Sequence, residues 1–194
     1  MRTEGSSLRH DPVSMSQARR AFAAHPFAAL VATGFGSGLS PVMPGTAGSV
    51  LGLVLSWFVA RALAPHGGSV AASVGLLTSG LLAGLVGVAV SGPVCRALGE
   101  KDPGCIVIDE VSGQLLASAA VPLVTARAPS FEIGLWIGSF VLFRFYDIFK
   151  PGPIRPLQDL PGGWGVVLDD VAGGLAAAAT LLLGHWFLAN LGWI

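Results

Sequence analysis

Long stretches of the chain carry no charged side chain, and this pattern predicts helices that cross a membrane. The stretches without Asp, Glu, Lys or Arg are residues 21–60, 62–95, 111–126, 133–143 and 171–194. A helix that crosses the hydrocarbon core of a bilayer needs ~20 mostly apolar residues. Together with the Gly- and Pro-containing links between the apolar runs, the pattern predicts about five spans, at residues 48–64, 70–92, 106–125, 131–149 and 166–188.

The segment before the first span has a different pattern. Residues 1–16 are polar and are predicted to form a disordered tail, so that residues 17–194 make up a single membrane-embedded domain. Residues 17–31 place arginines beside large apolar side chains, which is typical of a helix lying in the membrane interface. Residues 34–49 are rich in glycine and proline and predict a loop or broken helix. The expected fold class is therefore all-α, a polytopic membrane helix bundle with an N-terminal interfacial helix.

Composition agrees with a membrane protein and excludes other classes. Only 11% of the 194 residues are charged and 53% are hydrophobic, whereas soluble domains carry roughly 25% charged residues. The net charge is zero and no basic stripe is present, so a nucleic-acid partner is not expected. Nothing in the pattern indicates a protein partner. Cys95 and Cys105 follow no metal or redox spacing and are interpreted as small core residues, and none of the four histidines receives a catalytic role.

The basic residues predict the orientation of the spans. With five spans, three links share one side of the membrane: the segment before residue 48, residues 93–105 and residues 150–165. That side carries nine basic residues, namely Arg2, Arg9, Arg19, Arg20, Arg96, Lys101, Arg144, Lys150 and Arg155. The other side carries two, Arg61 and Arg127. Because basic residues concentrate in cytoplasmic links, the three links are predicted to face the cytoplasm.

Two stretches 60 residues apart repeat one pattern that contains acids. Residues 106–113 and 166–173 both read as three aliphatic residues, two acids, Val, a small residue and Gly. Each stretch opens a predicted span on the cytoplasmic side. The glycine four residues after the first acid lies on the same helix face, where it allows another backbone to approach. A pair of such helices would bring four carboxylates together.

These carboxylates, Asp109, Glu110, Asp169 and Asp170, have two interpretations. They could bind Mg²⁺, which prefers hard oxygen ligands and often takes carboxylates together with water and a substrate phosphate. They could instead be acids that the helix dipole favours near helix N-termini. The second interpretation explains a single acid better than two adjacent pairs inside aliphatic runs, where ionisable residues are costly and usually functional.

A third span contributes Asp147, with Arg144 and Lys150 three residues before and after it. One interpretation is an Arg–Asp ion pair with a snorkelling lysine at a helix end. The other is a metal-binding Asp147 beside two phosphate-binding cations. In the glycine-rich loop, Thr46 and Ser49 precede or begin a span, where they could cap the helix or contact a phosphate.

The motifs together resemble the phosphatidylglycerophosphatase A family of bacterial lipid phosphatases. The matching blocks are GSGLSPVMPGTAGS at 36–49, KDPGCIVIDEVSGQ at 101–114, FRFYDIFKPGPI at 143–154 and GGWGVVLDDVAGG at 162–174. Tyr146 departs from the Phe expected before Asp147. The resemblance implies a Mg²⁺-dependent phosphomonoesterase that converts phosphatidylglycerophosphate to phosphatidylglycerol and phosphate at the bacterial inner membrane, with its active site on the cytoplasmic face.

The combined hypothesis gives each group a role. The predicted metal shell, direct or through water, is Asp109, Glu110, Asp147, Asp169 and Asp170. Asp109, Asp169 and Asp170 are the predicted catalytic carboxylates, and one of the acids could act as the general base. Thr46, Ser49, Arg144 and Lys150 are expected to hold the phosphate. One or two metals, and attack by water or through a phospho-carboxylate, remain open.

The alternative function is a small ion or proton-coupled transporter, since carboxylates inside membranes also mark ion paths. A transporter should hold its acids near the middle of its spans, whereas these acids are predicted near one end of their helices.

Overall fold

The computed structural model describes residues 15–192, and every regular element in that part of the chain is helical. The elements are α1 (Met15–Ala24), α2 (Pro26–Ala32), η1 (Ser37–Leu39), α3 (Pro44–Leu98), α4 (Ile108–Ser118), α5 (Val121–Thr125), η2 (Pro129–Phe131), α6 (Glu132–Phe149), η3 (Gly152–Asp159) and α7 (Gly163–Asn190). The all-α class is therefore confirmed. Of the tail predicted at 1–16, residues 1–14 lie outside the described residues, and Met15 and Ser16 begin α1.

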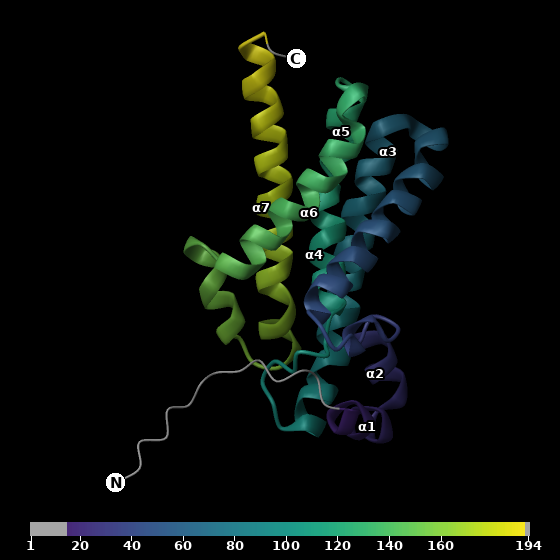
Figure 1. Ribbon diagram of the computed structural model, residues 1–194, viewed down its shortest axis with the longest axis vertical. Coiled ribbons are helices and arrows are strands. Elements are labelled where there is room, and N and C mark those ends of the chain that lie inside the picture. Colours follow the sequence, from purple (N-terminus) through teal and green to yellow (C-terminus); the bar gives the residue numbers. More distant parts are fainter. Residues whose placement is uncertain (1–14, 193–194) are drawn as a thin grey trace.

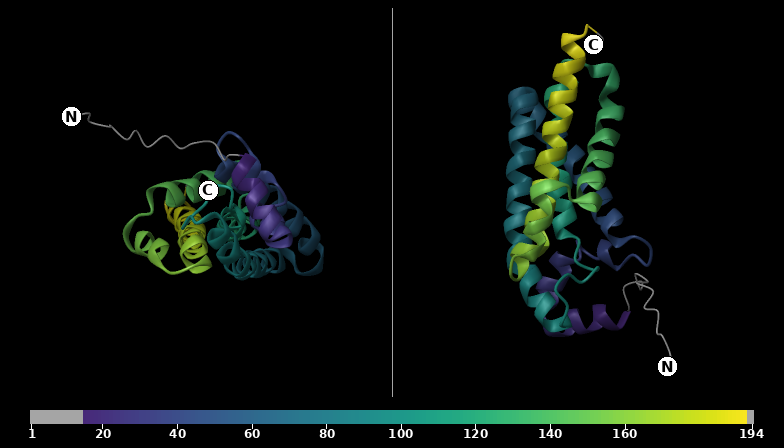
Figure 2. Two further views of the ribbon diagram at one scale, coloured as in Figure 1. Left: turned by 90° about the horizontal axis from the view of Figure 1, so that it is seen from below. Right: turned by 90° about the vertical axis from the view of Figure 1, so that its left-hand side faces the viewer.

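The long helices lie side by side roughly along one common axis, some running up and others down, which gives an elongated bundle (Figures 1 and 2). Helix α3 folds back on itself at Gly67 and Gly68, where the backbone leaves helical geometry. Gly68 has φ +66° and ψ −155°, a conformation that residues with a β-carbon avoid. The break lies within the link predicted at 65–69, so α3 supplies two antiparallel limbs rather than one rod.

Two helices, α3 and α7, are long and apolar enough to cross a membrane. The two limbs of α3 correspond to the expected spans at 48–64 and 70–92, and α7 corresponds to the one at 166–188. The other two expected spans are helical but shorter. Residues 106–125 form α4 and α5, and residues 131–149 contain the 18-residue α6. The number of crossings, expected to be about five, therefore stays a prediction.

Residues 15–47, the described part of the segment before the first span, and the links 93–105 and 150–165 lie toward the same end of the bundle, in the lower part of Figure 1. Helix α1 lies across this end, crosswise to the long helices (Figure 2). The segment predicted as one helix over 17–31 is divided into α1 and α2, because His25 is non-helical with φ −143° and ψ 73°. The cause is Pro26, which disfavours a helical residue before it and is well suited to begin α2.

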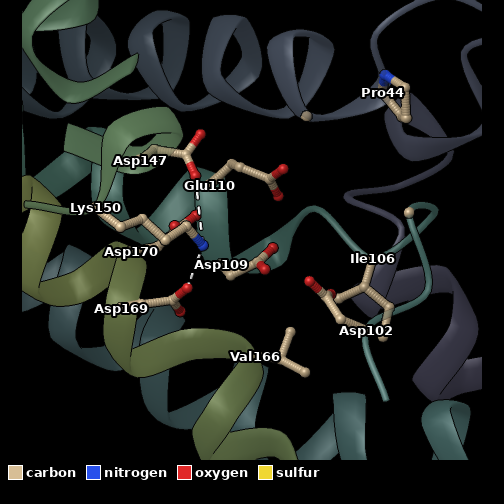
Figure 3. Close-up of a pocket in the computed structure, with 12 residues that line it drawn as sticks. Pro44, Asp102, Ile106, Asp109, Glu110, Asp147, Lys150, Val166, Asp169 and Asp170 are labelled. Carbon is tan, nitrogen blue, oxygen red and sulfur yellow. Dashed lines mark hydrogen bonds and ion pairs between the residues drawn. The ribbon is translucent and has the colours of Figure 1, made fainter. Parts of the chain in front are cut away.

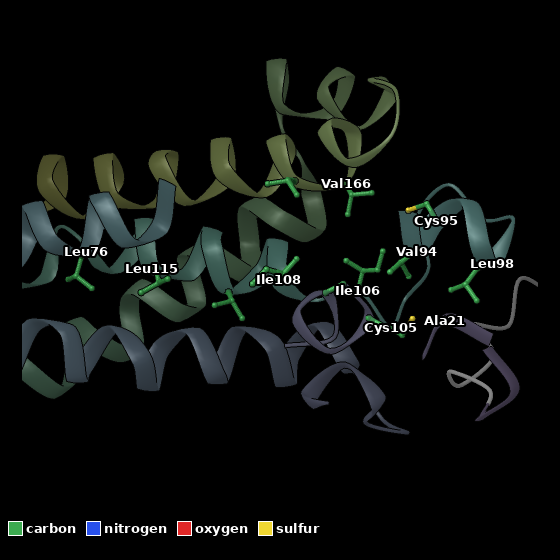
Figure 4. Packing of buried hydrophobic residues seen from close by; sticks show 14 of the residues in the cluster. Ala21, Leu76, Val94, Cys95, Leu98, Cys105, Ile106, Ile108, Leu115 and Val166 are labelled. Carbon is green, nitrogen blue, oxygen red and sulfur yellow. The ribbon is translucent and has the colours of Figure 1, made fainter. Parts of the chain in front are cut away.

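Helix α4 lies at the centre of the bundle, between α3 and α7. All its residues except Glu110 are buried. Apolar side chains such as Leu76, Leu115 and Val166 form a continuous core around it, which extends to Ala21 of α1 (Figure 4). This core fixes the first turn of α4 at the same end of the bundle as the three links.

Candidate active site

Acidic residues from several elements meet in a pocket at that end of the bundle (Figure 3). The pocket has a volume of about 160 Å³. Its lining comes from the start of α3, the link before α4, the first turn of α4, the end of α6 and the first half of α7. The residues are Pro44, Gly45, Asp102, Gly104, Ile106, Asp109, Glu110, Asp147, Lys150, Val166, Asp169 and Asp170. All five predicted metal ligands are therefore brought together.

The two repeated stretches meet through their glycines. Gly113 of α4 lies against α7, where a β-carbon on it would be 2.7 Å from the carbonyl oxygen of Asp170. On α7, Gly174 makes the close contact, whereas Gly173 faces α6 at an ordinary distance of 3.5 Å from Tyr146 Cβ. The repeated sequence pattern predicted that Gly173, four residues after Asp169, would make this contact on α7. The two helices thus pack with a one-residue shift, which brings Asp109 beside Asp170.

One oxygen atom from each of Asp109, Glu110 and Asp170 can be chosen so that all three lie within 4.8 Å of one another. Asp109 is 7% exposed and Asp170 is 3% exposed. Asp109 Oδ1, Glu110 Oε2 and Asp169 Oδ1 are buried and have no hydrogen-bond partner among the described residues. Buried carboxylate oxygens without a partner are costly. Hard oxygen donors directed into a polar pocket fit a divalent cation such as Mg²⁺.

Lys150 reaches into the acids from the end of α6. It follows the last helical residue and has φ +44°, a left-handed conformation that turns the chain out of the helix. Its side chain forms an ion pair with Asp169, and its Nζ lies 4.0 Å from Asp147 Oδ1. Burial lowers the pKa of Lys150, but the hydrogen bond to Asp169 and the charges of the neighbouring acids outweigh this effect and raise it. The lysine is therefore a fixed positive charge in the pocket wall.

Arg144 lies beside the pocket without lining it. Its Nη1 is 2.6 Å from Asp147 Oδ2 and donates a hydrogen bond of 3.2 Å to Ser49 Oγ. The Arg–Asp ion pair that the spacing left as one interpretation is therefore present. Arg144 connects the first limb of α3 to α6 and orients Asp147.

Residues 44–49, predicted as part of a glycine-rich loop, form the first turns of α3, and they contribute residues to the pocket other than those predicted. Thr46 and Ser49 do not line the pocket, and Ser49 Oγ donates to the carbonyl oxygen of Gly45 over 2.9 Å. Pro44 and Gly45 form the wall instead. A β-carbon on Gly45 would collide with the Glu110 carboxylate, so the absence of a side chain there leaves room for the acid.

In the described part of the chain, Asp102 is the one charged residue lining the pocket that the sequence did not indicate. It lies in the link before α4 and is exposed at the pocket wall, across from the other acids (Figure 3). The sequence contains a feature that could have indicated Asp102 as a site residue, because this acid lies shortly before the aliphatic run that leads into Asp109.

Comparison with known proteins gives one consistent family. The profile of the family described as Phosphatidylglycerophosphatase A matches residues 30–185. A phosphatidylglycerophosphatase A of Escherichia coli strain K12 is 32% identical over 180 residues, covering 91% of this chain and 92% of the relative. One of Haemophilus influenzae is 33% identical over 162 residues, covering 82% of this chain and 90% of the relative.

A Bacteroides thetaiotaomicron protein, provisionally named a phosphatidylinositol-3-phosphatase, is 32% identical over 161 residues, covering 82% of this chain and 94% of the relative. No solved structure gives a significant match. The profile match and the near-complete coverage of these relatives show that the chain belongs to the phosphatidylglycerophosphatase A family.

Proposed function

We propose that this protein is a Mg²⁺-dependent phosphomonoesterase that converts phosphatidylglycerophosphate to phosphatidylglycerol and inorganic phosphate. The observation that carries the proposal is the cluster of buried Asp109 and Asp170 with half-buried Glu110, beside Lys150 and at one end of an apolar helix bundle. The substrate follows the names of the Escherichia coli and Haemophilus relatives. The Bacteroides name indicates a different phospholipid headgroup and the same kind of chemistry, removal of a phosphate.

Asp109, Glu110 and Asp170 would hold the Mg²⁺ directly, since one oxygen of each lies within 4.8 Å of the other two. Asp147 and Asp169 line the same pocket but already pair with Arg144 and Lys150, so they would act through water or orient these cations. A bound Mg²⁺ supplies Lewis-acid stabilisation of the phosphate and lowers the pKa of a bound water. An oxygen that remains outside the metal shell, on Asp109, Asp169 or Asp170, could accept the proton of the attacking water.

The phosphate group would bind on the Lys150 side of the pocket. Lys150 is a positive charge held against the acids, and it would stabilise the negative charge of the phosphate during transfer. Arg144 lies farther back and would position Asp147. In hydrolysis the water oxygen would bond to phosphorus as the bond between phosphorus and the glycerol oxygen breaks. The proton that the carboxylate accepted from the water would pass to the departing oxygen, which gives the alcohol of phosphatidylglycerol and inorganic phosphate.

The position of the acids supports a headgroup enzyme rather than a transporter. Asp109 and Glu110 lie in the first turn of α4, and Asp147 lies two residues before the end of α6. None of these is near the middle of a predicted span, where a transporter would need them. The excess of basic residues on this end favours the cytoplasmic side of the bacterial inner membrane, where a multi-pass protein would meet the phosphate of a lipid headgroup.

The test is phosphate release from phosphatidylglycerophosphate by the full-length protein purified in detergent. Activity should require Mg²⁺ and disappear with a chelator. Asp109→Asn and Asp170→Asn should each lower kcat at least about 100-fold. Residues that only orient metal ligands typically cost ~10–100-fold when replaced, and loss of a ligand itself should cost at least as much. The double variant should be scarcely worse than either single one, because groups that act as a unit are non-additive.

Asp159→Asn is the matched control. Asp159 is an exposed acid at the same end of the bundle, paired with Lys101 over 3.1 Å, and its variant should keep the wild-type rate. Full turnover after thorough metal removal would refute the metal mechanism. Losses that multiply in the double variant would refute a single shared centre.

A further inference from the structure

A second crevice lies at the opposite end of the bundle from the acid pocket. It has a volume of about 240 Å³ and is walled by both limbs of α3, by α5 and by the start of α6. Most of its lining residues are small, and two are charged, Arg61 and Glu132. The fold-back of α3 at Gly68 forms part of the wall. No group of the proposed catalytic pocket belongs to it.

Several polar groups in this crevice lack a partner. Within residues 15–192, neither Arg61 nor Glu132 forms an ion pair, although both line the same space. Arg61 instead lies over the ring of Trp57, with Cζ 5.4 Å from the ring centroid. Thr125 Oγ1 and Trp136 Nε1 are buried without a hydrogen-bond partner. The crevice thus presents a cation, an anion and two neutral donors that a ligand could satisfy.

An apolar groove of about 440 Å³ continues from the crevice and shares Arg61, Glu132 and Trp136 with it. Its other lining residues are all apolar and extend along α3 and α6 toward the middle of the bundle, namely Leu53, Val54, Trp57, Ile133 and Ile137. Leu53 and Arg61 are eight residues apart, about 12 Å along the helix. Half of the hydrocarbon core is about 15 Å thick, so the groove has the length of one leaflet's acyl region.

We propose that the crevice and groove bind one phospholipid from the leaflet on the far side of the membrane from the acid pocket. The headgroup of this lipid carries both a phosphate and an ammonium. The guanidinium of Arg61 would bind the phosphate through paired hydrogen bonds. Glu132 would bind the ammonium and disfavour a headgroup without a positive charge. Trp136 Nε1 and Thr125 Oγ1 would donate to phosphate or ester oxygens. The acyl chain would cover the exposed faces of Val54 and Ile137.

This proposal rests on the proposed function only in that the bundle spans the membrane, and it does not depend on phosphatase activity. The lipid site and the proposed function can therefore be refuted separately. The test is native mass spectrometry of the detergent-purified full chain, with phosphatidylethanolamine or phosphatidylglycerol of identical acyl chains added. The wild-type protein should bind phosphatidylethanolamine about tenfold more tightly, the effect of one charge-assisted contact. Glu132→Gln should remove this preference, since Arg61 still binds the phosphate of either lipid.

Two further variants and a control complete the experiment. Arg61→Gln should weaken binding of both lipids about tenfold or more, and Trp136→Phe, which keeps the ring packing, should weaken both several-fold. Arg127→Gln is the matched control, because Arg127 is an exposed arginine at the same end that donates to the carbonyl oxygen of Leu123 over 3.1 Å and lines neither space. It should bind both lipids as the wild type does.

Equal binding of the two lipids by the wild-type protein would overturn the headgroup assignment. Unchanged binding in both Arg61→Gln and Trp136→Phe would overturn the site itself. A lipid-free dimer that Trp136→Phe or Arg61→Gln dissociates would show that a second copy of the chain, rather than a phospholipid, occupies the groove.

Discussion

Gly113 of α4 and Gly174 of α7 face each other across a contact that has no room for a side chain. A β-carbon on Gly174 would lie 3.0 Å from the Cα of Gly113 and closer still to its carbonyl oxygen. Gly113 follows Asp109 by four residues, and Gly174 follows Asp170 by four residues. Each glycine therefore lies one turn beyond an acid on the same helix face. This contact sets the distance between the two acids that are proposed to share a metal.

Replacing Gly174 should separate these acids. Gly174→Ala places a methyl group against backbone atoms that cannot rotate away, and overpacking of this kind costs about 1–3 kcal/mol. We expect a lower midpoint of thermal unfolding in detergent and a weaker response to Mg²⁺. Gly184→Ala is the control on the same helix. A β-carbon there meets nothing within 4 Å, so it should be neutral or stabilise by up to about 1 kcal/mol through helix propensity. Equal behaviour of the two variants would contradict the contact.

Lys150 should act on the substrate rather than on the fold alone. Lys150→Met removes the cation that pairs with Asp169, and loss of a charge-assisted phosphate contact should raise KM about tenfold or more. Lys150→Arg should recover part of the loss. Lys101→Met, an exposed lysine at the same end of the bundle, should leave steady-state kinetics unchanged. Unchanged values of both KM and kcat in Lys150→Met would show that the lysine does not act on the substrate.

Asp102 should contribute negative charge to the pocket without being essential. Asp102→Asn should raise the Mg²⁺ concentration needed for half-maximal activity roughly fivefold, which corresponds to about 1 kcal/mol of electrostatic attraction in a solvent-exposed setting. The measurement is a Mg²⁺ titration at saturating substrate, compared with Asp159→Asn. An unchanged titration would place Asp102 outside the electrostatic reach of the site.

The orientation of the bundle can be tested with single cysteines. Asp159→Cys lies at the acid-pocket end and Ser130→Cys at the other, and both positions are exposed. An impermeant thiol reagent should label Asp159→Cys only after the cytoplasmic side is opened, and Ser130→Cys in intact cells. The parent protein serves as the blank, because Cys95 and Cys105 are buried. Labelling of both positions from the same side would refute the topology.

Much of the architecture follows from local features of the chain. The apolar runs predict the helical segments, because continuous hydrophobic stretches of this length are stable as helices away from water. The acid pairs stand out for the same reason, since charges inside such runs are rare. Hydrophobic pattern alone does not fix where a helix ends, because the single residue Pro26 divides the predicted helix at 17–31 into α1 and α2.

The placement of the site depends on how segments distant in the chain pack together. The one-residue shift that pairs Asp109 with Asp170 arises from the fit of Gly113 against Gly174, which the equal spacing of the two stretches does not reveal. The path of a link decides two further features, namely the turn of the chain at Lys150 and the position of Asp102 in the pocket wall. The rotation of a helix decides a third, the contact of Arg144 with Ser49. Helix propensity and hydrophobic pattern act within a few residues, whereas rotation and register are decided by side-chain packing between helices.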